Sequence, residues 1–227
     1  MQRVASADAP RLAHSAKRAR HNLPALFPAN APLTVVYQPT SKQVEVFAID
    51  DNGALQNVRR VHFGSAAPLW EQPVALTGPG FAPPGAPVTA IFQPLNDQLE
   101  VYVVGNDGAV MGVWNEHNGP WKPAFNLTAA GFAPRYSELA PVRADSIELT
   151  AVFVVDNSGT LQMIWKLHDR AWQIPRTASD PGFSAPGGSV AAVWEPKLSG
   201  RDAVTNPGFA PAGARWSVYS VPVACSA

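Results

Sequence analysis

The sequence predicts an all-β protein built from a tandem repeat of about 51 residues, and three recurring features support this prediction. Tight hairpin turns recur, each between two apolar segments: DDNG at 50–53, GNDG at 105–108 and DNSG at 156–159. Tryptophans recur 51 residues apart: Trp70, Trp121 and Trp172. Loops with a phenylalanine and a proline also recur: LFPANAP at 26–32, GFAP at 80–83 and 131–134, GFSAP at 182–186 and PGFAP at 207–211. These spacings indicate repeated copies of one structural unit.

Each copy is predicted to contain four short strands. In the best-defined copy they lie near 88–93, 98–104, 109–115 and 121–127. The Asn-Gly and Asp-Gly pairs tolerate the positive φ angles of tight hairpins, so each turn fixes the register of two strands. A repeat of this length with four strands is typical of a β-propeller blade. Helical solenoids have similar periods, but the 23 prolines and the hairpin turns count against them.

The repeats define the predicted domain organisation. Residues 1–25 form a basic N-terminal segment, helical or disordered, and residues 26–227 form the propeller-repeat domain. Its copies are three complete ones and a partial one: 33–80, 84–131, 135–182 and 188–227. The fourth copy lacks about 25 residues, corresponding to its hairpin and outer strand, and RWSVYSVP (215–222) would then open a fifth. We expect a homo-oligomer that completes the open edges, although an irregular or truncated molecule is the alternative.

Composition restricts the function classes. Lys+Arg and Asp+Glu number 17 each, so the chain lacks the basic excess of nucleic-acid binders. No apolar run is long enough for a membrane span, and the start lacks a classical signal peptide, so the sequence leaves the localisation open between the cytoplasm and export by a non-classical route. The single cysteine, Cys225, excludes an intrachain disulfide. No nucleophile elbow, zinc-binding helix motif or phosphate-binding glycine loop occurs, which predicts a protein with no enzymatic activity and no cofactor.

The stretch LEVYVVGNDGAVMGVWNEHNGPW (99–121), entered by GFAPPGAPVTAIF (80–92), resembles the repeat of PLL-like bacterial fucose-binding β-propeller lectins. The resemblance covers about 26–196 and the last Phe-Pro loop. It implies a propeller with shallow sugar sites between adjacent blades, and fucosylated or methylated glycans as ligands. This chain departs by having about half the usual number of blades. The related fungal propellers place an arginine beside the second-strand aromatic, but here those positions hold Glu45, Glu100 and Ala151. The arginine-based site is therefore not carried over.

Trp114 and Trp165 are the first candidates for sugar contact, because each follows a hairpin glycine by six residues. A flat indole can stack on the C–H face of a sugar and offers an N–H donor. The alternative is that these rings pack between blades. Glu100, Asn115 and Glu116 are predicted to supply hydroxyl-binding groups beside Trp114, because sugar sites combine an aromatic platform with a few polar side chains.

Three histidines recur nine residues after a hairpin glycine: His62, His117 and His168. Equivalent residues on successive blades lie too far apart to share a metal ion, so no metal site is predicted. A hydrogen-bonding role for His117 and His168 at loops, toward sugar hydroxyls or backbone, is the functional hypothesis. The sequence therefore favours a multivalent, non-catalytic lectin whose partners are glycans. The alternative is a propeller scaffold for protein–protein interaction without a sugar site.

Overall fold

The structure is a computed structural model that describes residues 26–61, 69–145, 148–168, 170–195 and 215–220 of the 227-residue chain. These residues form antiparallel sheets and, within those ranges, no α-helix. The predicted N-terminal segment, His62 and Cys225 lie outside the described residues.

Each sheet corresponds to one copy of the repeat. The first contains β1 (Thr34–Gln38), β2 (Gln43–Ile49) and β3 (Leu55–Val61), with the short β4 (Leu69–Trp70) and β5 (Val74–Ala75) both paired to β3. The second contains β6 (Val88–Gln93), β7 (Gln98–Val104), β8 (Val110–Glu116) and β9 (Phe125–Asn126). The third contains β10 (Ala140–Ala144), β11 (Leu149–Val155), β12 (Leu161–Leu167) and β13 (Arg176–Thr177). The predicted all-β repeat is therefore confirmed, with fourth strands much shorter than expected.

The fourth sheet corrects one prediction. It consists of β14 (Val190–Glu195) and β15 (Arg215–Ser220), which pair antiparallel over their whole length. The segment that was expected to open a fifth copy is thus the second strand of the fourth sheet. In the other copies only a few residues separate the first two strands, whereas 196–214 separate β14 from β15, which explains why the sequence pattern did not reveal this pairing.

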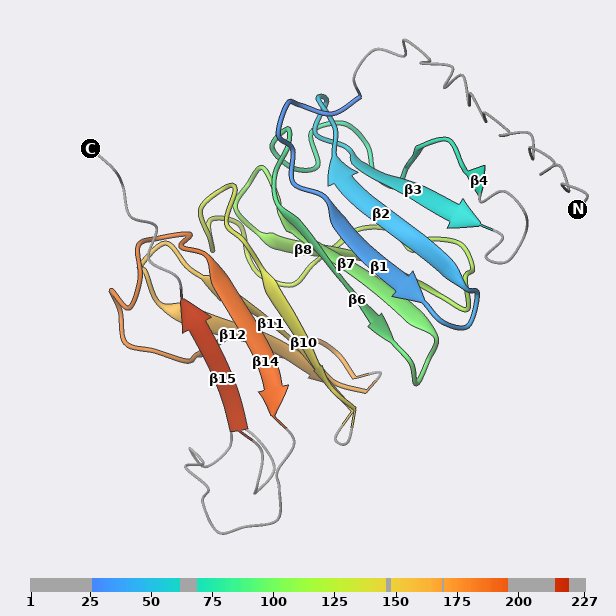
Figure 1. The fold of residues 1–227 in the computed structure, drawn as a ribbon. Helices are drawn as coiled ribbons and strands as arrows, with labels where there is room; N and C mark the ends of the chain where they lie inside the picture. The colour runs from blue at the N-terminus through green and yellow to red at the C-terminus, as the bar shows by residue number, and fades with distance from the viewer. Residues whose placement is uncertain (1–25, 62–68, 146–147, 169, 196–214, 221–227) are drawn as a thin grey trace, which may run out of the picture.

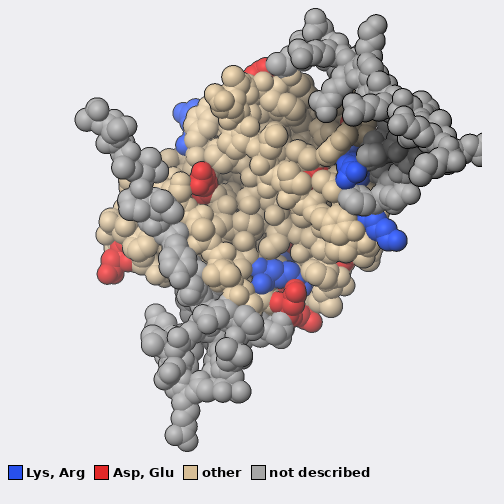
Figure 2. All heavy atoms as spheres, viewed as in Figure 1, with Lys and Arg blue, Asp and Glu red and all other residues tan. Residues whose placement is uncertain are grey.

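The sheets stand side by side in an arc, with their first strands nearest one another (Figure 1). β1 contacts β6, β6 contacts β10, and β10 contacts β14. The face in Figure 2 carries only scattered charged side chains, and most of its described surface is neither acidic nor basic. This arrangement, in which sheets pack face to face around an arc, is that of part of a β-propeller.

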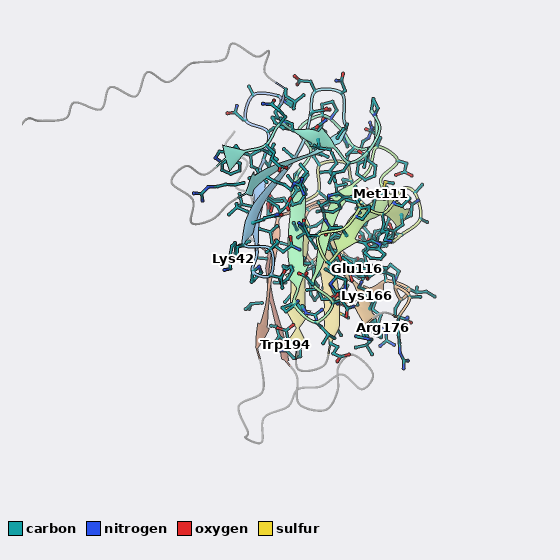
Figure 3. All side chains as sticks on the ribbon, turned by 90° about the vertical axis from the view of Figure 1, so that its right-hand side faces the viewer. Lys42, Met111, Glu116, Lys166, Arg176 and Trp194 are labelled. Atoms are coloured by element: carbon teal, nitrogen blue, oxygen red, sulfur yellow. The ribbon has the colours of Figure 1, made fainter. Side chains whose placement is uncertain are left out.

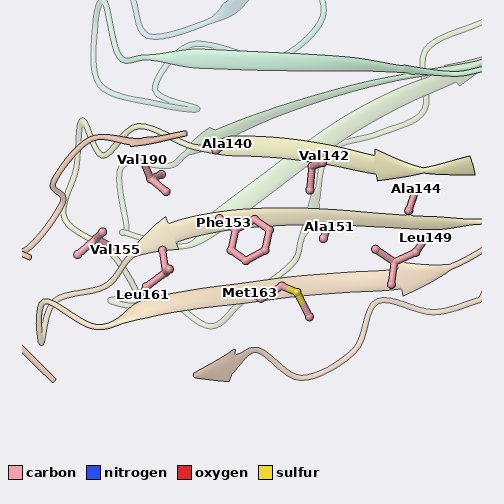
Figure 4. Close-up of a cluster of buried hydrophobic side chains, with 10 residues drawn as sticks. All are labelled: Ala140, Val142, Ala144, Leu149, Ala151, Phe153, Val155, Leu161, Met163 and Val190. Atoms are coloured by element: carbon pink, nitrogen blue, oxygen red, sulfur yellow. The ribbon is translucent and has the colours of Figure 1, made fainter. Parts of the chain in front are cut away.

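The core lies in the three contacts between successive sheets, which we call the first, second and third seams. We call the face of a sheet that is directed toward the preceding sheet its leading face, and the opposite face its trailing face. Each seam joins the trailing face of one sheet to the leading face of the next. Because side chains alternate along a strand, one sheet supplies residues to two seams. In the third seam, Phe153 and Met163 of the third sheet pack with Val190 of β14 (Figure 4). The first and second seams hold equivalent clusters around Phe47 and Tyr102.

Hydrogen bonds from the Phe-Pro loops hold successive hairpin turns together. Gly80 N and Ala82 N donate to Asn52 O and Gly53 O, at 2.9 and 3.0 Å. The next hairpin then reaches the same loop, because Asn106 Nδ2 donates to Gly80 O at 2.7 Å. The pattern repeats one copy later, where Asn157 Nδ2 donates to Gly131 O at 2.7 Å. Each loop therefore ties two hairpin turns together.

Candidate functional site

One arrangement of side chains recurs at the three seams. It lies near the start of the second strand and the end of the third strand of each of the first three sheets. A residue on the second strand faces its cross-strand partner on the third, and directly opposed partners project to the same side of a sheet. These pairs are Glu45 with Arg59, Glu100 with Trp114, and Ala151 with Trp165. The following sheet contributes one further residue to the seam, namely the residue that comes directly after the tryptophan of its third strand. This residue is Asn115 at the first seam and Lys166 at the second.

The second seam holds a closed cluster of charged and polar groups. Glu100 is 2% exposed and forms an ion pair with Lys166 Nζ at 2.7 Å. The same carboxylate accepts hydrogen bonds from Gln98 Nε2 at 2.7 Å and from the Tyr102 hydroxyl. Lys166 also lies over the ring of Trp172, 5.3 Å from its centroid. The two buried charges therefore compensate each other across the seam, and Lys166 is labelled in Figure 3.

Trp114 lies on the same face as Glu100 but is only half-buried. Lys122 Nζ lies 5.5 Å from the centroid of its ring, which is a favourable geometry for a cation over an indole. The backbone N–H of Lys122 also donates to Trp114 O at 2.8 Å. The indole thus has one part in the seam and another part open to solvent.

The first seam has the same geometry with different chemistry. Glu45 is 1% exposed, and its Oε2 accepts a hydrogen bond from Asn57 Nδ2 at 2.6 Å. Burial raises the pKa of Glu45, and this effect is only partly offset by the Asn57 hydrogen bond and the charge of Arg59. Arg59 itself forms an ion pair with Glu71 at 2.8 Å.

Several buried acceptors face the first seam without a hydrogen-bond partner among the described residues, and two of them belong to the repeated site positions. They are Glu45 Oε1 and Asn115 Oδ1, and both are buried. Asn115 projects toward this seam because it is paired with Leu99, which belongs to the cluster packed on the first sheet. An unpaired buried acceptor is costly, so a hydroxyl or a protonated carboxyl directed at either oxygen would be stabilising.

The third seam is apolar at the same position. Ala151 takes the place of the two glutamates, and Trp165 and Trp194 pack against its cluster. Arg176, which can be seen at the outer side in Figure 3, lies over the Trp165 ring at 6.0 Å. The indole N–H of Trp165 is buried and has no hydrogen-bond partner within the described part of the chain. This N–H is therefore a buried donor whose hydrogen bond is not satisfied within the described part of the chain.

The structure separates the residues that the sequence grouped together. Glu100 and Trp114 are cross-strand partners at the second seam, as the hypothesis required. Asn115, however, projects from the opposite face of the same sheet into the first seam. Trp165 occupies the matching position of the third sheet.

His117 and His168 lie at the ends of third strands. Both have positive φ angles, 51° and 47°. Their backbone N–H groups donate to Asp97 O and Glu148 O, at 2.9 and 2.7 Å. Their Nδ1 atoms lie 3.8 and 3.1 Å from the carboxylates of the same two residues. These contacts close the ends of the sheets: the backbone N–H groups of both histidines are bonded to backbone carbonyls, and both imidazoles lie beside carboxylates of the protein itself.

Sequence reasoning missed Lys166, which aligns with Asn115 in the repeat. Its signal was available: it is a lysine directly after a third-strand tryptophan, at a position that faces the preceding sheet. Within the described residues no group of three His, Cys, Asp or Glu side chains could hold a metal ion. Nor does that part of the chain contain a helix long and apolar enough to cross a membrane.

Comparison with solved structures identifies lectins. BP39L lectin from Burkholderia pseudomallei is 33% identical, with a TM-score of 0.68 over 74% of this chain and 46% of that chain. AofleA from Arthrobotrys oligospora is 18% identical, with a TM-score of 0.60 over 89% of this chain and 60% of that one. An Aleuria aurantia lectin mutant in complex with Fucα1-6GlcNAc is also 18% identical, with a TM-score of 0.55 over 86% and 64%. The two fungal matches speak for the fold alone.

The chain spans about half the length of BP39L lectin and less than two thirds of each fungal lectin. Neither a family model nor a curated protein matches the sequence. The match to BP39L lectin rests on both sequence and fold, and it includes most of the repeated region. These comparisons confirm the resemblance inferred from the repeat: the chain has a β-propeller-type fold, and it is similar in sequence and structure to lectins.

Proposed function

We propose that this protein is a multivalent lectin that binds carbohydrate at its seams and does not transform it. The sequence similarity to BP39L lectin over 74% of the chain supports the class of ligand. The sugar sites are formed where a flat side chain of one sheet adjoins the leading face of the next. Trp114 and Trp165 supply the platforms, and Arg59 takes that position at the first seam.

The observation that carries this proposal is the repetition of one arrangement at three seams. Trp165 presents an unpaired indole N–H, and the site positions of the first seam present two unpaired acceptor oxygens. Sugars combine C–H faces, which stack on indoles, with hydroxyls that both donate and accept hydrogen bonds. Several weak, equivalent sites raise the useful affinity for a multivalent glycan without new contacts. Association of more than one chain, which we also propose, would increase the number of sites further.

The state of the seam carboxylates supports binding without catalysis. Glycoside hydrolysis uses two carboxyl groups that are free to transfer protons or attack the sugar. Glu100 instead is held by Lys166, Gln98 and Tyr102. A carboxylate neutralised in this way is a structural group. Glycans that contain fucose are the first class to test, because the Aleuria aurantia lectin structure is a complex with Fucα1-6GlcNAc.

The direct test is a glycan array with the labelled full chain, followed by calorimetric titration of the best ligand. We expect selective binding that Trp114→Ala and Trp165→Ala each weaken severalfold, and that the double substitution abolishes. Phe183→Ala is the matched control, because this aromatic ring is 47% exposed and lies in a Phe-Pro loop away from both platforms. A blank array, or binding unaffected by the double substitution, would contradict the proposal. A blank array would favour a scaffold for protein partners.

A further inference from the structure

The leading face of the first sheet is mostly apolar and partly exposed. Val35 and Tyr37 of β1 are 63% and 49% exposed, and Leu33, just before the strand, is 61% exposed. Val46 and Val58 continue this face onto β2 and β3, because they are cross-strand partners and Val46 also pairs with Val35. Contiguous exposed apolar residues of this kind usually mark an interaction surface.

The leading face is buried in the second and third sheets, because a preceding sheet packs against it. The residues equivalent to Val46 and Val58 are Val101 and Val113 in the second sheet, each 1% exposed. In the third sheet they are Val152 and Ile164, and both are fully buried. The leading face of a sheet is therefore built to be covered by the trailing face of another.

Trp70 shows the same contrast with a single side chain. It is 50% exposed, although its two equivalents pack edge-on against aromatic rings of the preceding sheet. Trp121 packs on Phe47 with ring centroids 5.6 Å apart, and Trp172 packs on Tyr102 at 5.7 Å. The equivalence follows from the backbone, since the residue after each tryptophan donates to the third strand: Glu71 to Arg59, Lys122 to Trp114 and Gln173 to Trp165, each at 2.8 Å.

A matching open face exists at the other end of the arc. Val190, Ala192 and Trp194 of β14 belong to the cluster of the third seam, so Val193 projects from the trailing face of the fourth sheet. Val193 is 52% exposed. The described part of the chain thus exposes residues on the leading face of the first sheet and on the trailing face of β14, the two kinds of face that pack together at every internal seam.

We propose that the leading face of the first sheet binds the trailing face of the fourth sheet in a second copy of this chain. Such a head-to-tail contact closes into a ring if the rotation between copies allows it. A closed pair is the smallest such ring, because each copy supplies one leading face and one trailing face. Each new contact would be a further seam, with Trp70 packed against the partner. This inference builds on the association proposed above, but it does not depend on sugar binding.

The decisive measurement is the mass of the full chain in solution, without sugar, by sedimentation equilibrium over a wide concentration range. We expect twice the 24.1 kDa of one chain, with no larger species. Val35→Glu buries a charge in the contact and should return the mass to that of one chain. Ile174→Glu is the matched control, because this residue is 86% exposed and lies away from both faces, and it should leave the doubled mass unchanged.

Three outcomes would overturn the proposal. One is a single-chain mass at every concentration, and another is a doubled mass that survives Val35→Glu. The third is a series of growing masses, which would indicate open head-to-tail filaments. Circular dichroism of Val35→Glu shows whether the variant is folded. If it is not, dilution of the wild-type chain provides the second test, with Trp70 fluorescence assigned by comparison with Trp70→Phe. We expect Trp70 to become more accessible to a quencher as the pair dissociates.

Removing residues 1–25 tests whether the leading face of the first sheet is covered by a second copy of the chain or by this N-terminal segment. A chain lacking 1–25 should keep the doubled mass. If the full chain has the mass of one copy and the shortened chain associates, the N-terminal segment covers the face and the proposal is wrong.

Discussion

The first and second seams place a glutamate at the same point of the repeat and surround it differently. Glu100 has an ion pair with Lys166 and two further hydrogen bonds. Glu45 has one hydrogen bond from Asn57, and burial raises its pKa. Both seams have equivalent clusters of buried apolar side chains beside the glutamate. The repeat therefore fixes where a buried carboxyl lies, while the next sheet determines whether that carboxyl has a cationic partner.

The largest effect should come from removing the charge partner at the second seam. Lys166→Met leaves the carboxylate of Glu100 buried without its cation, and breaking a buried pair typically costs about 3–5 kcal/mol. Urea unfolding of the variant and the wild type measures the loss. Lys122→Met is the control, since this lysine is exposed and its loss should stay within about 0.5 kcal/mol. Equal losses for the two lysines would contradict the assignment.

The hairpin turns offer a second comparison between the seams. Gly53 and Gly108 have φ angles of 76° and 78°, which disfavour any side chain. A Cβ at Gly53 would lie 2.3 Å from Ala82 O, whereas one at Gly108 would lie 2.8 Å from Ala133 O. We therefore expect Gly53→Ala to destabilise the protein by about 2–3 kcal/mol and Gly108→Ala by less.

Thermal unfolding of both glycine variants tests this order, with Gly78→Ala as the control. A Cβ at Gly78 would meet no atom within 4 Å. The expectation fails if Gly78→Ala is as damaging as Gly53→Ala.

Glu45 should make stability depend on pH in the opposite way to a salt-bridged acid. Its folded pKa is raised above the ordinary value of 4.5. As pH rises through 4.5 the unfolded chain loses this proton first, so folding stability falls until the folded pKa is passed and is constant above it. Each unit of difference corresponds to about 1.4 kcal/mol.

Glu45→Gln should remove this fall and leave the protein at neutral pH as stable as the wild type or more so. The measurement is the free energy of unfolding of both proteins from acidic to neutral pH. Glu100→Gln is the contrasting variant, and it should lose stability at neutral pH because Lys166 then lacks its partner. If the two glutamine variants behave alike, the two seams do not differ as described.

The smallest effects should come from the side chains that tie neighbouring hairpins, and here the seams should agree. Asn106→Ala and Asn157→Ala each remove one exposed hydrogen bond of 2.7 Å to a glycine carbonyl. We expect a loss of about 0.5–1 kcal/mol for each, measured by urea unfolding. A difference between the two larger than that range would show that the repeated geometry hides unequal contributions.

Much of the fold followed from the sequence because the repeat carries its own register. The Asn-Gly and Asp-Gly turns fix which strands pair, and the 51-residue interval between tryptophans shows where in the sequence each new sheet begins. The pairing of β14 with β15 was beyond this reasoning. The intervening 19 residues contain no hairpin motif, and only the tertiary structure brings the two strands together.

The candidate site was predictable only within one sheet. Glu100 and Trp114 belong to the two strands of one hairpin, so their proximity followed from the register. Asn115 follows Trp114 in sequence and therefore points to the other seam, a consequence of strand alternation that the sequence grouping overlooked. The contact of Glu100 with Lys166 crosses between sheets. It depends on the stacking distance and angle of two sheets, which no local pattern encodes.

The Phe-Pro loops have a consequence for how this chain could be shortened, extended or recombined. Each loop is hydrogen-bonded to the hairpin turn before it and to the hairpin turn after it. The boundary between two sheets is therefore stabilised by both of them. The cooperative unit is a pair of neighbours, as in other linear arrays where stability is the sum of each unit and its contact with the next. Dividing the chain within a Phe-Pro loop, between two sheets, would disrupt the loop and its hydrogen bonds to two hairpin turns. Dividing the chain at a hairpin turn, in the middle of a sheet, would keep each loop intact. Engineered versions should therefore exchange segments that run from one hairpin turn to the next.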